Sequence, residues 1–355
     1  MSGTILIMAG GTGGHVFPAL AVAEQLQAAG YRILWLGAED GMETRLVPRY
    51  GFPVATLGVG RLRGGGLKRK LIGPLQLIRA VWQARSVIRR ERPVLVVGFG
   101  GFVSAPGGIA ARLCGVPLVI HEQNAVPGMT NRLLARFSDQ VLEGFEGAMP
   151  GAIWVGNPVR EEITGLNDPA QRYASRRGPL RVLVLGGSQG ALALNQDLPE
   201  LLLAALGPHL EVRHQCGRGR AEEARPVYKA LGLNATVTEF IDDMAQAYDW
   251  ADLVVCRAGA LTVAEVAAAG VAALFVPLPT AVDDHQTLNA NWLVDRGAAL
   301  MLPQRDMNAS ALARSLAGMT ERDALAELAC RARQLAIADS AERVARLCEE
   351  VADGR

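Results

Sequence analysis

A histidine follows a glycine-rich turn near the start of the chain, and this pairing could support proton transfer beside a bound ligand. The turn is GGTGGH at residues 10–15, where four glycines let backbone N–H groups come close to a ligand. The helix expected after it would direct the positive end of its dipole into the same space. A neutral imidazole at His15 could accept a proton from a hydroxyl. The turn alone is equally compatible with a tight connection that binds nothing.

Two further turns of this kind lie in the second half of the chain. Residues 186–191 (GGSQGA) add a hydroxyl, Ser188, that could bond a phosphate oxygen. Residues 257–262 are expected to begin a helix that carries Glu265 in its first turn, where a carboxylate could bind hydroxyls or only stabilise the helix dipole. Helix N-termini at neighbouring strands would converge at the edge where open α/β sheets bind ligands.

The sequence predicts neither a cofactor nor a metal. The first turn lacks the third glycine of a dinucleotide-binding fingerprint. No Asp-x-Asp occurs, and the acidic pairs 242–243 and 283–284 lack further ligands at a suitable spacing. If the ligand carries a phosphate or diphosphate, its charge would therefore be stabilised by helix dipoles, backbone N–H groups and Arg160.

Short β-branched runs alternate with amphipathic helical stretches, which is the βαβ pattern. Runs that are apolar throughout are typical of a parallel sheet buried on both faces, so the predicted class is doubly wound α/β. The runs lie at residues 5–8, 32–37, 94–99, 117–122, 182–187, 252–256 and 272–277.

The strand, glycine-rich turn and helix pattern begins twice, which predicts two Rossmann-like domains in a chain of 355 residues. We place the boundary near 160, giving domains 1–160 and 161–337, and we interpret residues 156–179, rich in turn formers, as the linker. The last helical segment, at 338–355, has an apolar stripe that could pack on either half.

Composition excludes several classes of protein. Lys plus Arg number 36 against 35 Asp plus Glu, so nucleic acid is not an expected partner. The five cysteines are scattered, which argues against a disulfide framework or a zinc site. No signal peptide or membrane span is expected, because the N-terminus lacks a basic and then apolar region and the longest apolar stretch is broken by Gly and Pro. These features predict a cytoplasmic protein.

One segment, residues 61–92, is strongly basic, with ten Lys or Arg and a single acid. Apolar residues recur there at helical spacing, which is typical of a helix that binds an anionic membrane surface. The alternative is a helix whose apolar stripe packs on its own sheet while the arginines are solvated. The density of charge favours the membrane. The expected membrane contacts are Leu71, Leu75, Ile78, Trp82, Arg79 and Arg85.

Six motifs in order carry a close resemblance to the MurG family of bacterial glycosyltransferases. They are GGTGGHVFPALAVA (10–23), HEQNAVPGMTN (121–131), GNPVR (156–160), GGSQGA (186–191), FIDDM (240–244) and RAGALTVAE (257–265). The resemblance covers nearly the whole chain. It implies a GT-B fold, in which an N-terminal acceptor domain and a C-terminal UDP-sugar domain face a cleft and the segment 338–355 crosses back to the N-terminal domain.

The resemblance implies an inverting, metal-independent transfer of N-acetylglucosamine from UDP-GlcNAc. The acceptor would be the C4 hydroxyl of MurNAc in undecaprenyl-diphospho-MurNAc-pentapeptide (lipid I), which becomes lipid II in peptidoglycan synthesis. The enzyme would be peripheral at the cytoplasmic face of the bacterial inner membrane. Cell-wall or division proteins are candidates for further partners.

The resemblance also assigns residues to the donor. Ser188 would meet the diphosphate, the Ile241 backbone the uracil edge, and Glu265 the ribose hydroxyls. Gln286 and Asn124 would contact the GlcNAc or the reaction centre. The other donor or substrate contacts are Thr12, Gly13, Gly14, Arg160, Ala260, Leu261, Thr262, Val263 and Ala264.

Inversion by direct displacement needs one group to take the proton of the acceptor hydroxyl. We assign His15 as this base and Glu122 as the second candidate. His15 could instead only orient a sugar or phosphate, and Glu122 could only hold the glycine-rich turn in place.

Three other functions remain open from the sequence. A UDP-GlcNAc epimerase could share the two-domain architecture, although the basic segment 61–92 argues against it. A nucleotide-binding module without catalysis would also have glycine-rich turns. A dehydrogenase could use Glu39 or Asp40 on a ribose, but the dinucleotide fingerprint is missing.

Overall fold

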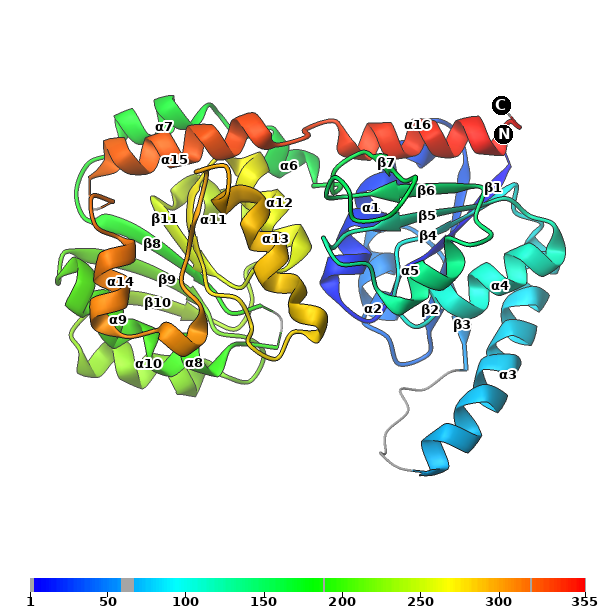
Figure 1. Cartoon of the computed structure of the whole chain (residues 1–355), viewed down its shortest axis with the longest axis horizontal. Coiled ribbons are helices and arrows are strands. Elements are labelled where there is room, and N and C mark those ends of the chain that lie inside the picture. The colour runs from blue at the N-terminus through cyan, green and yellow to red at the C-terminus, as the bar shows by residue number, and fades with distance from the viewer. Residues whose placement is uncertain (1–2, 59–66, 188, 320, 355) are drawn as a thin grey trace. The chain divides into compact units, whose positions relative to one another are not determined.

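A computed structural model describes residues 3–58, 67–187, 189–319 and 321–354, with the backbone alone at 67–74 and 282. The chain divides into two compact units, one made of residues 1–160 with 339–355 and the other of residues 161–338. Each unit contains one parallel β-sheet with helices packed on it (Figure 1). The predicted class, two doubly wound α/β domains, is confirmed.

The first unit has a seven-stranded sheet in the order β3-β2-β1-β4-β5-β6-β7. Its strands are β1 (Thr4–Met8), β2 (Arg32–Ala38), β3 (Val54–Leu57), β4 (Leu95–Gly98), β5 (Leu118–Glu122), β6 (Gln140–Glu143) and β7 (Ile153–Trp154). Its helices are α1 (Gly13–Ala28), α2 (Glu43–Leu46), η1 (Val47–Tyr50), α3 (Leu67–Glu91), α4 (Ser104–Cys114), α5 (Met129–Leu134) and α16 (Ser340–Ala352).

Successive residues of one strand belong to two different cores, which explains why the central strands are apolar throughout. Ile5 and Ile7 of β1 pack in a cluster that includes residues of α1 and α16. Leu6 and Met8 pack on the other side of the sheet, in a cluster that includes residues of α3 and α4. Because helices cover both faces, neither alternate set of side chains meets water.

The second unit has a six-stranded sheet in the order β10-β9-β8-β11-β12-β13. Its strands are β8 (Leu180–Leu185), β9 (Leu210–Gln215), β10 (Asn234–Thr238), β11 (Leu253–Cys256), β12 (Ala272–Phe275) and β13 (Leu300–Met301). Its helices are α6 (Glu161–Thr164), α7 (Pro169–Ser175), α8 (Leu192–Gln196), α9 (Leu198–Leu206), α10 (Ala221–Ala230), α11 (Met244–Trp250), α12 (Ala260–Ala269), η2 (Val282–Asp284), α13 (His285–Val294), η3 (Gln304–Asp306), α14 (Ala309–Ser315) and α15 (Arg322–Leu335).

The interpretation of residues 156–179 as a linker was wrong for the part after 160. That part forms α6 and α7, which pack within the second unit. Tyr173 is 2 % exposed, and its hydroxyl donates to the Asp252 carbonyl at 2.6 Å and accepts from the Ala272 N–H at 3.1 Å. The segment was predicted to be a linker because it is rich in turn formers and has few apolar residues. Two of those few apolar side chains, Ile163 and Tyr173, are buried and hold it in the second unit.

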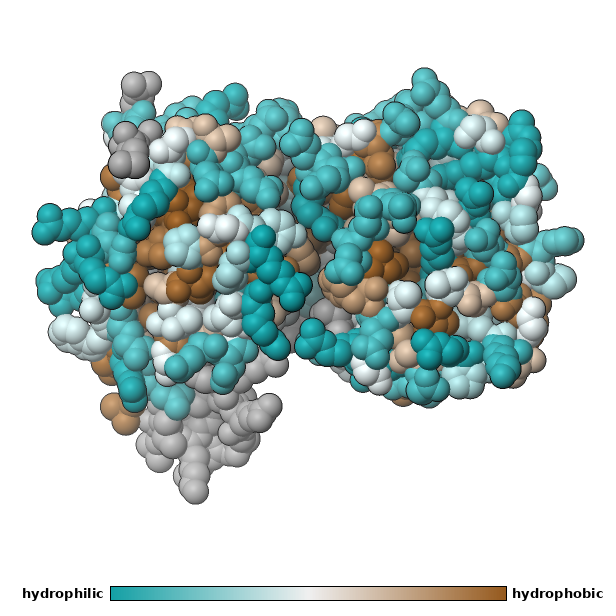
Figure 2. All heavy atoms as spheres, turned by 180° about the vertical axis from the view of Figure 1, so that it is seen from behind, coloured by the Kyte–Doolittle hydropathy of each residue, from teal (hydrophilic) through white to brown (hydrophobic). Residues whose placement is uncertain are grey.

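Hydrophilic residues cover most of the molecular face seen in Figure 2, with apolar residues scattered among them. Within the part of the chain that the structure describes, no helix is long and apolar enough to cross a membrane. All five cysteines are free thiols.

Candidate active site

The first glycine-rich turn joins β1 to α1. Gly11 has a φ of +88°, a left-handed conformation that favours glycine. Thr12 is the N-cap residue of α1, and Gly13 and Gly14 are the first two residues of the helix. The first helical hydrogen bond runs from the His15 N–H to the Thr12 carbonyl at 3.1 Å. The N–H groups of Thr12, Gly13 and Gly14 thus lie outside the helical ladder and can donate to a ligand.

Glu43, at the start of α2, holds this turn from behind and was missed by the sequence analysis. Its carboxylate is fully buried and accepts from the Ala38 N–H at 2.8 Å and from the Gly11 N–H at 3.2 Å. Three glycines, Gly10, Gly37 and Gly41, surround the Glu43 side chain closely. Any other residue at one of these positions would place its Cβ within 2.7 Å of a Glu43 atom.

His15 directs one ring nitrogen at the same turn. Its Nδ1 lies 3.1 Å from the Gly10 carbonyl oxygen, which can only accept, so in the neutral ring Nδ1 carries the proton and Nε2 has the lone pair. Burial lowers the pKa of His15 below the usual 6.5, although the bond to Gly10 and the charges of Glu122 and Glu43 oppose the shift. The imidazole is therefore neutral at neutral pH, and Nε2 can accept a proton.

Glu122 ends β5 and holds the loop that follows. It is 2 % exposed. Its Oε1 accepts from the N–H and Nδ2 of Asn124 at 2.9 and 3.2 Å. Its Oε2 accepts from the Gly128 N–H at 3.0 Å and from Asn131 Nδ2 at 2.9 Å. Four donors occupy this carboxylate, so the geometry favours His15 over Glu122 as the base. Asn124 is half-buried on this loop.

Arg160 is the last residue of the first stretch of the first unit. Its guanidinium carbon lies 5.0 Å from the ring centroid of Phe17 in α1, one turn beyond the glycine-rich turn. This cation–π contact places Arg160 in the same unit as His15.

The second glycine-rich turn follows β8 and is held by Gln215, the last residue of β9. The Gly187 N–H donates to Gln215 Oε1 at 3.0 Å, and Gln215 Nε2 donates to the carbonyls of Gly187 and Glu239 at 2.9 and 3.0 Å. Glu239 stands two residues before Ile241, which is half-buried. Gln215 thus links the turn to the segment expected to bind uracil. Ser188 lies outside the described residues.

The third turn leads into α12, and one prediction about it was wrong. The helix begins at Ala260, directly after the extended Gly259, so Glu265 lies in the second turn, where a helix dipole no longer favours a carboxylate. Glu265 is 6 % exposed, and its Oε2 accepts from the Tyr248 hydroxyl at 3.1 Å. The other expected donor contacts on this helix are buried or half-buried: Ala260, Leu261, Thr262, Val263 and Ala264.

α13 carries the expected sugar-binding residue. Gln286 Oε1 accepts from the Leu278 N–H at 2.9 Å, which leaves the two donors of this amide for another partner. Asn289 is fully buried and donates to the Ala258 carbonyl at 3.2 Å, so α13 is attached to the third turn. The helix follows Asp283 and Asp284, with φ values of 53° and 50°, and such left-handed residues are uncommon outside glycine.

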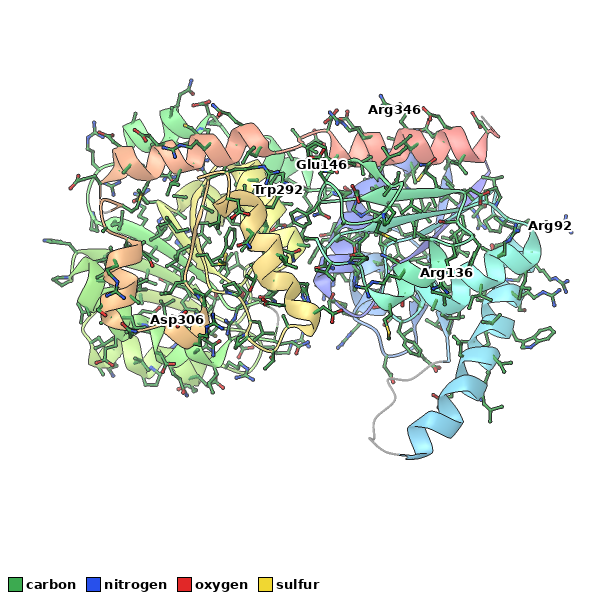
Figure 3. The ribbon with its side chains drawn as sticks, viewed as in Figure 1. Arg92, Arg136, Glu146, Trp292, Asp306 and Arg346 are labelled. Carbon is green, nitrogen blue, oxygen red and sulfur yellow. The ribbon has the colours of Figure 1, made fainter. Side chains whose placement is uncertain are left out.

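The expected membrane residues lie on α3. Leu75, Ile78 and Trp82 are 68 %, 54 % and 62 % exposed, whereas a different stripe of the helix is buried. Arg79 is exposed, and the guanidinium carbon of Arg85 lies 5.2 Å from the Trp82 ring centroid. The side chain of Leu71 and residues 61–66 lie outside the described part of the chain. Arg92 and Arg136 add exposed cations to this unit (Figure 3).

The alternative interpretation of α3, in which its predicted stripe packs on the sheet, does not hold for the described side chains. The buried residues of the helix are Ala80, Ala84, Val87 and Ile88. They belong to the core beneath α3 and α4.

Among the described residues, no three His, Cys, Asp or Glu side chains come together as ligands for a metal ion.

Comparison with known proteins agrees with this geometry. Residues 5–143 match the glycosyltransferase family 28 N-terminal domain and residues 181–344 match the C-terminal domain of the same family. The chain is 71 % identical, over the full length of both proteins, to the UDP-N-acetylglucosamine–N-acetylmuramyl-(pentapeptide) pyrophosphoryl-undecaprenol N-acetylglucosamine transferase of Alcanivorax borkumensis. It is 54 % identical to the protein of that name from Ralstonia nicotianae, covering 97 % of this chain and 95 % of the relative.

Solved structures give the same result. The crystal structure of Acinetobacter baumannii MurG superposes with a TM-score of 0.84 at 43 % identity, covering 98 % of this chain and 99 % of that one. The glycosyltransferase of kitacinnamycin superposes with a TM-score of 0.71 at 16 % identity, covering 97 % and 98 % of the two chains, which supports the fold alone.

Two Rossmann-like domains with glycine-rich turns at their strand ends, a neutral histidine and glycosyltransferase relatives define the class, a glycosyltransferase of the GT-B fold. Within that class, the chain belongs to glycosyltransferase family 28 and to its MurG family. None of these relatives is an epimerase, so the alternative function of UDP-GlcNAc epimerase is not supported.

Proposed function

We propose that this protein transfers N-acetylglucosamine from UDP-GlcNAc to the C4 hydroxyl of MurNAc in undecaprenyl-diphospho-MurNAc-pentapeptide, with inversion at the anomeric carbon. The observation that carries the proposal is the identity of 71 % over the full length to a transferase named for this donor and acceptor. The neutral His15 beside the first turn supports it, because this chemistry needs a base.

In the proposed step, the C4 oxygen of MurNAc attacks the anomeric carbon while His15 Nε2 takes the hydroxyl proton. The bond between the anomeric carbon and the phosphate oxygen breaks, and its electron pair leaves with UDP. The hydrogen bond from Nδ1 to Gly10 fixes the tautomer that presents a lone pair at Nε2. The proposed step uses no metal ion, because backbone N–H groups stabilise the leaving diphosphate.

The second unit is proposed to hold the donor. The turn at 186–191 would bind the diphosphate, the Ile241 backbone the uracil edge, and the residues of α12 the ribose. Glu265 supports this role because its carboxylate has a Tyr248 hydroxyl on one oxygen and so lies in a fixed position. Gln286 would offer its N–H donors to the GlcNAc hydroxyls.

The first unit is proposed to meet the lipid-linked acceptor at the cytoplasmic face of the bacterial inner membrane, where the enzyme would be peripheral. Exposed Leu75, Ile78 and Trp82 beside arginines support this, because an amphipathic helix of that composition binds anionic lipid. The domain limits 1–160 and 161–337, with 338–355 packed against the first domain, are part of the proposal.

The test is an assay with sugar-labelled UDP-GlcNAc and a short-chain lipid I analogue in excess EDTA. Label in the lipid product together with an equal amount of UDP would support the transferase and its independence of metal. Intact UDP-GlcNAc in the presence of acceptor and folded enzyme would refute the proposal. Tyr173→Phe is the control for a change that affects packing alone. It removes buried hydrogen bonds at the amino ends of β11 and β12, away from the turns, so it should still form both products.

A further inference from the structure

Glu43 and His15 make hydrogen bonds to the two ends of one peptide group. The N–H of the peptide between Gly10 and Gly11 donates to Glu43 Oε2 at 3.2 Å. The carbonyl of that same peptide, on Gly10, accepts from His15 Nδ1 at 3.1 Å. Carboxylate, peptide and imidazole thus form one chain of hydrogen bonds.

From this chain we propose that Glu43 is a positioning residue for His15 and acts through the Gly10–Gly11 peptide. In many enzymes a carboxylate bonds the imidazole directly and fixes its tautomer. Here a peptide group stands between the two. The role assigned to Glu43 rests on the proposed function of His15 as the base.

The chain of hydrogen bonds supports a positive charge on the imidazole. When Nε2 takes the hydroxyl proton, the ring becomes an imidazolium and its Nδ1–H becomes a stronger donor. Glu43 polarises the peptide through the Gly11 N–H, which makes the Gly10 carbonyl a better acceptor. The proton stays on the imidazole, and the carboxylate only stabilises the charge, as does the carboxylate of Glu122.

The surroundings of Glu43 show that the sequence makes room for this carboxylate. A Cβ at Gly10 would lie 2.5 Å from Glu43 Oε1, and one at Gly41 would lie 2.1 Å from the same atom. A buried charge is costly unless its hydrogen bonds are satisfied, and two backbone N–H groups satisfy this one. A Cβ at Gly101 would lie 2.3 Å from the Gly10 carbonyl oxygen, so the β4–α4 loop also keeps the peptide in place.

The first test replaces the carboxylate by an amide of the same shape. Glu43→Gln turns one acceptor into a donor that faces a backbone N–H, so we expect kcat to fall about 10- to 100-fold while KM for UDP-GlcNAc changes less than about twofold. Glu143→Gln is the matched control. Glu143 is 3 % exposed in the same unit and accepts from the N–H groups of Gly147 and Met149 at 2.6 and 2.7 Å. An equal fall of kcat in both variants would overturn the proposal.

The second test asks whether Glu43 acts through His15. Added to His15→Ala, Glu43→Gln is expected to cause little further loss of kcat, because two residues of one hydrogen-bonded chain are not additive. A full additional loss would show that Glu43 acts elsewhere and would refute the proposal.

A third measurement needs no activity, so it separates failure of this inference from failure of the proposed function. Nitrogen NMR of labelled histidine, with His15→Gln for assignment, reports the tautomer of His15. In the wild-type protein the Nδ1–H form is expected to dominate, and in Glu43→Gln its share is expected to fall. A dominant Nε2–H form in the wild type, or an unchanged share in a folded Glu43→Gln variant, would overturn the inference even if sugar transfer is observed.

Discussion

The two units hold their first glycine-rich turns with different side chains. In the first unit, the carboxylate of Glu43 accepts from Gly11 and Ala38 and donates nothing. In the second unit, the amide of Gln215 both accepts from and donates to Gly187, and it also donates to Glu239. Both side chains are buried behind the turn they hold.

The difference follows the charge of what each turn is proposed to face. A negative charge behind the first turn favours the imidazolium that His15 becomes during proton transfer. The same charge behind the second turn would repel the diphosphate of the donor. A neutral amide holds that turn equally well and adds no repulsion. The first turn is thus suited to chemistry and the second to binding an anion.

The largest expected effect separates chemistry from binding. His15→Ala should lower kcat about 100- to 10,000-fold, since a positioned general base contributes about that much, while Kd for UDP stays unchanged. Initial rates and calorimetry measure the two quantities. Because the pKa of His15 is lowered and its neutral form is the active one, kcat/KM of the wild type should hold down to pH 6.5 and fall only below it. If His15→Ala weakened UDP binding by the same factor as it lowered kcat, the first turn would not be specialised for chemistry.

A second prediction concerns a property that the units share. Each has one fully buried histidine in its sheet, His121 and His214, and burial lowers the pKa of both to about 4. His121 Nε2 lies 2.9 Å from the Gly156 carbonyl, and His214 lies between Tyr228 and Asn195 at 3.0 and 3.1 Å.

Both histidines are neutral when folded and have a pKa near about 6.5 when unfolded. The unfolded chain therefore binds more protons between pH 6.5 and 4, and stability is lost as the pH falls through this range. Each histidine should cost about 2 kcal/mol between pH 7 and pH 5. Urea unfolding of His121→Gln and His214→Gln at the two values measures it. An unchanged pH dependence in either variant would contradict the prediction for that unit.

The third prediction places a negative charge behind the second glycine-rich turn. Gln215→Glu should raise Kd for UDP about tenfold, because two like charges roughly 10 Å apart repel by about 1 to 2 kcal/mol at an effective dielectric near 20. Tyr173→Phe, which loses buried hydrogen bonds in the same unit, should leave Kd unchanged. Calorimetric titration with UDP measures both. If Gln215→Glu binds UDP as the wild type does, charge is not what distinguishes the two turns.

The sequence predicted the central strands of each sheet and missed strands at or next to the edges, for a physical reason. The predicted runs at 5–8, 32–37, 94–99 and 117–122 correspond to β1, β2, β4 and β5, which are adjacent in the first sheet. Such strands are buried on both faces and therefore apolar throughout. The missed strands of the second sheet are β10 and β13, which lie at its two edges, and β9 (LEVRHQ), which lies beside β10 and in which polar residues alternate with apolar ones over its first four positions. In β10 (NATVT), polar residues are common because one face meets solvent.

The candidate site was predicted where a motif carries its own signal and missed where a distant residue completes it. His15 follows its glycines directly in the sequence. Glu43 lies 32 residues from Gly11, and Gln215 lies 28 residues from Gly187, so no local pattern links either of them to its turn. Glu265 lies in the second helical turn of α12 but was predicted in the first, because no capping side chain marks where that helix begins.

The smallest expected effect compares one exposed arginine from each unit. Arg79 lies on α3 between Ile78 and Trp82, whereas Arg314 lies on α14 of the second unit. Arg79→Gln should weaken binding to vesicles with anionic lipid about fivefold, since a cation near such a surface contributes about 1 kcal/mol. Arg314→Gln should not, and neither variant should change Kd for UDP. Flotation with vesicles at low and high salt measures the difference, which salt should erase by screening. Equal losses for the two arginines would mean that attraction to lipid is spread over the whole protein, and only a loss confined to Arg79 would assign the membrane surface to the unit that carries His15.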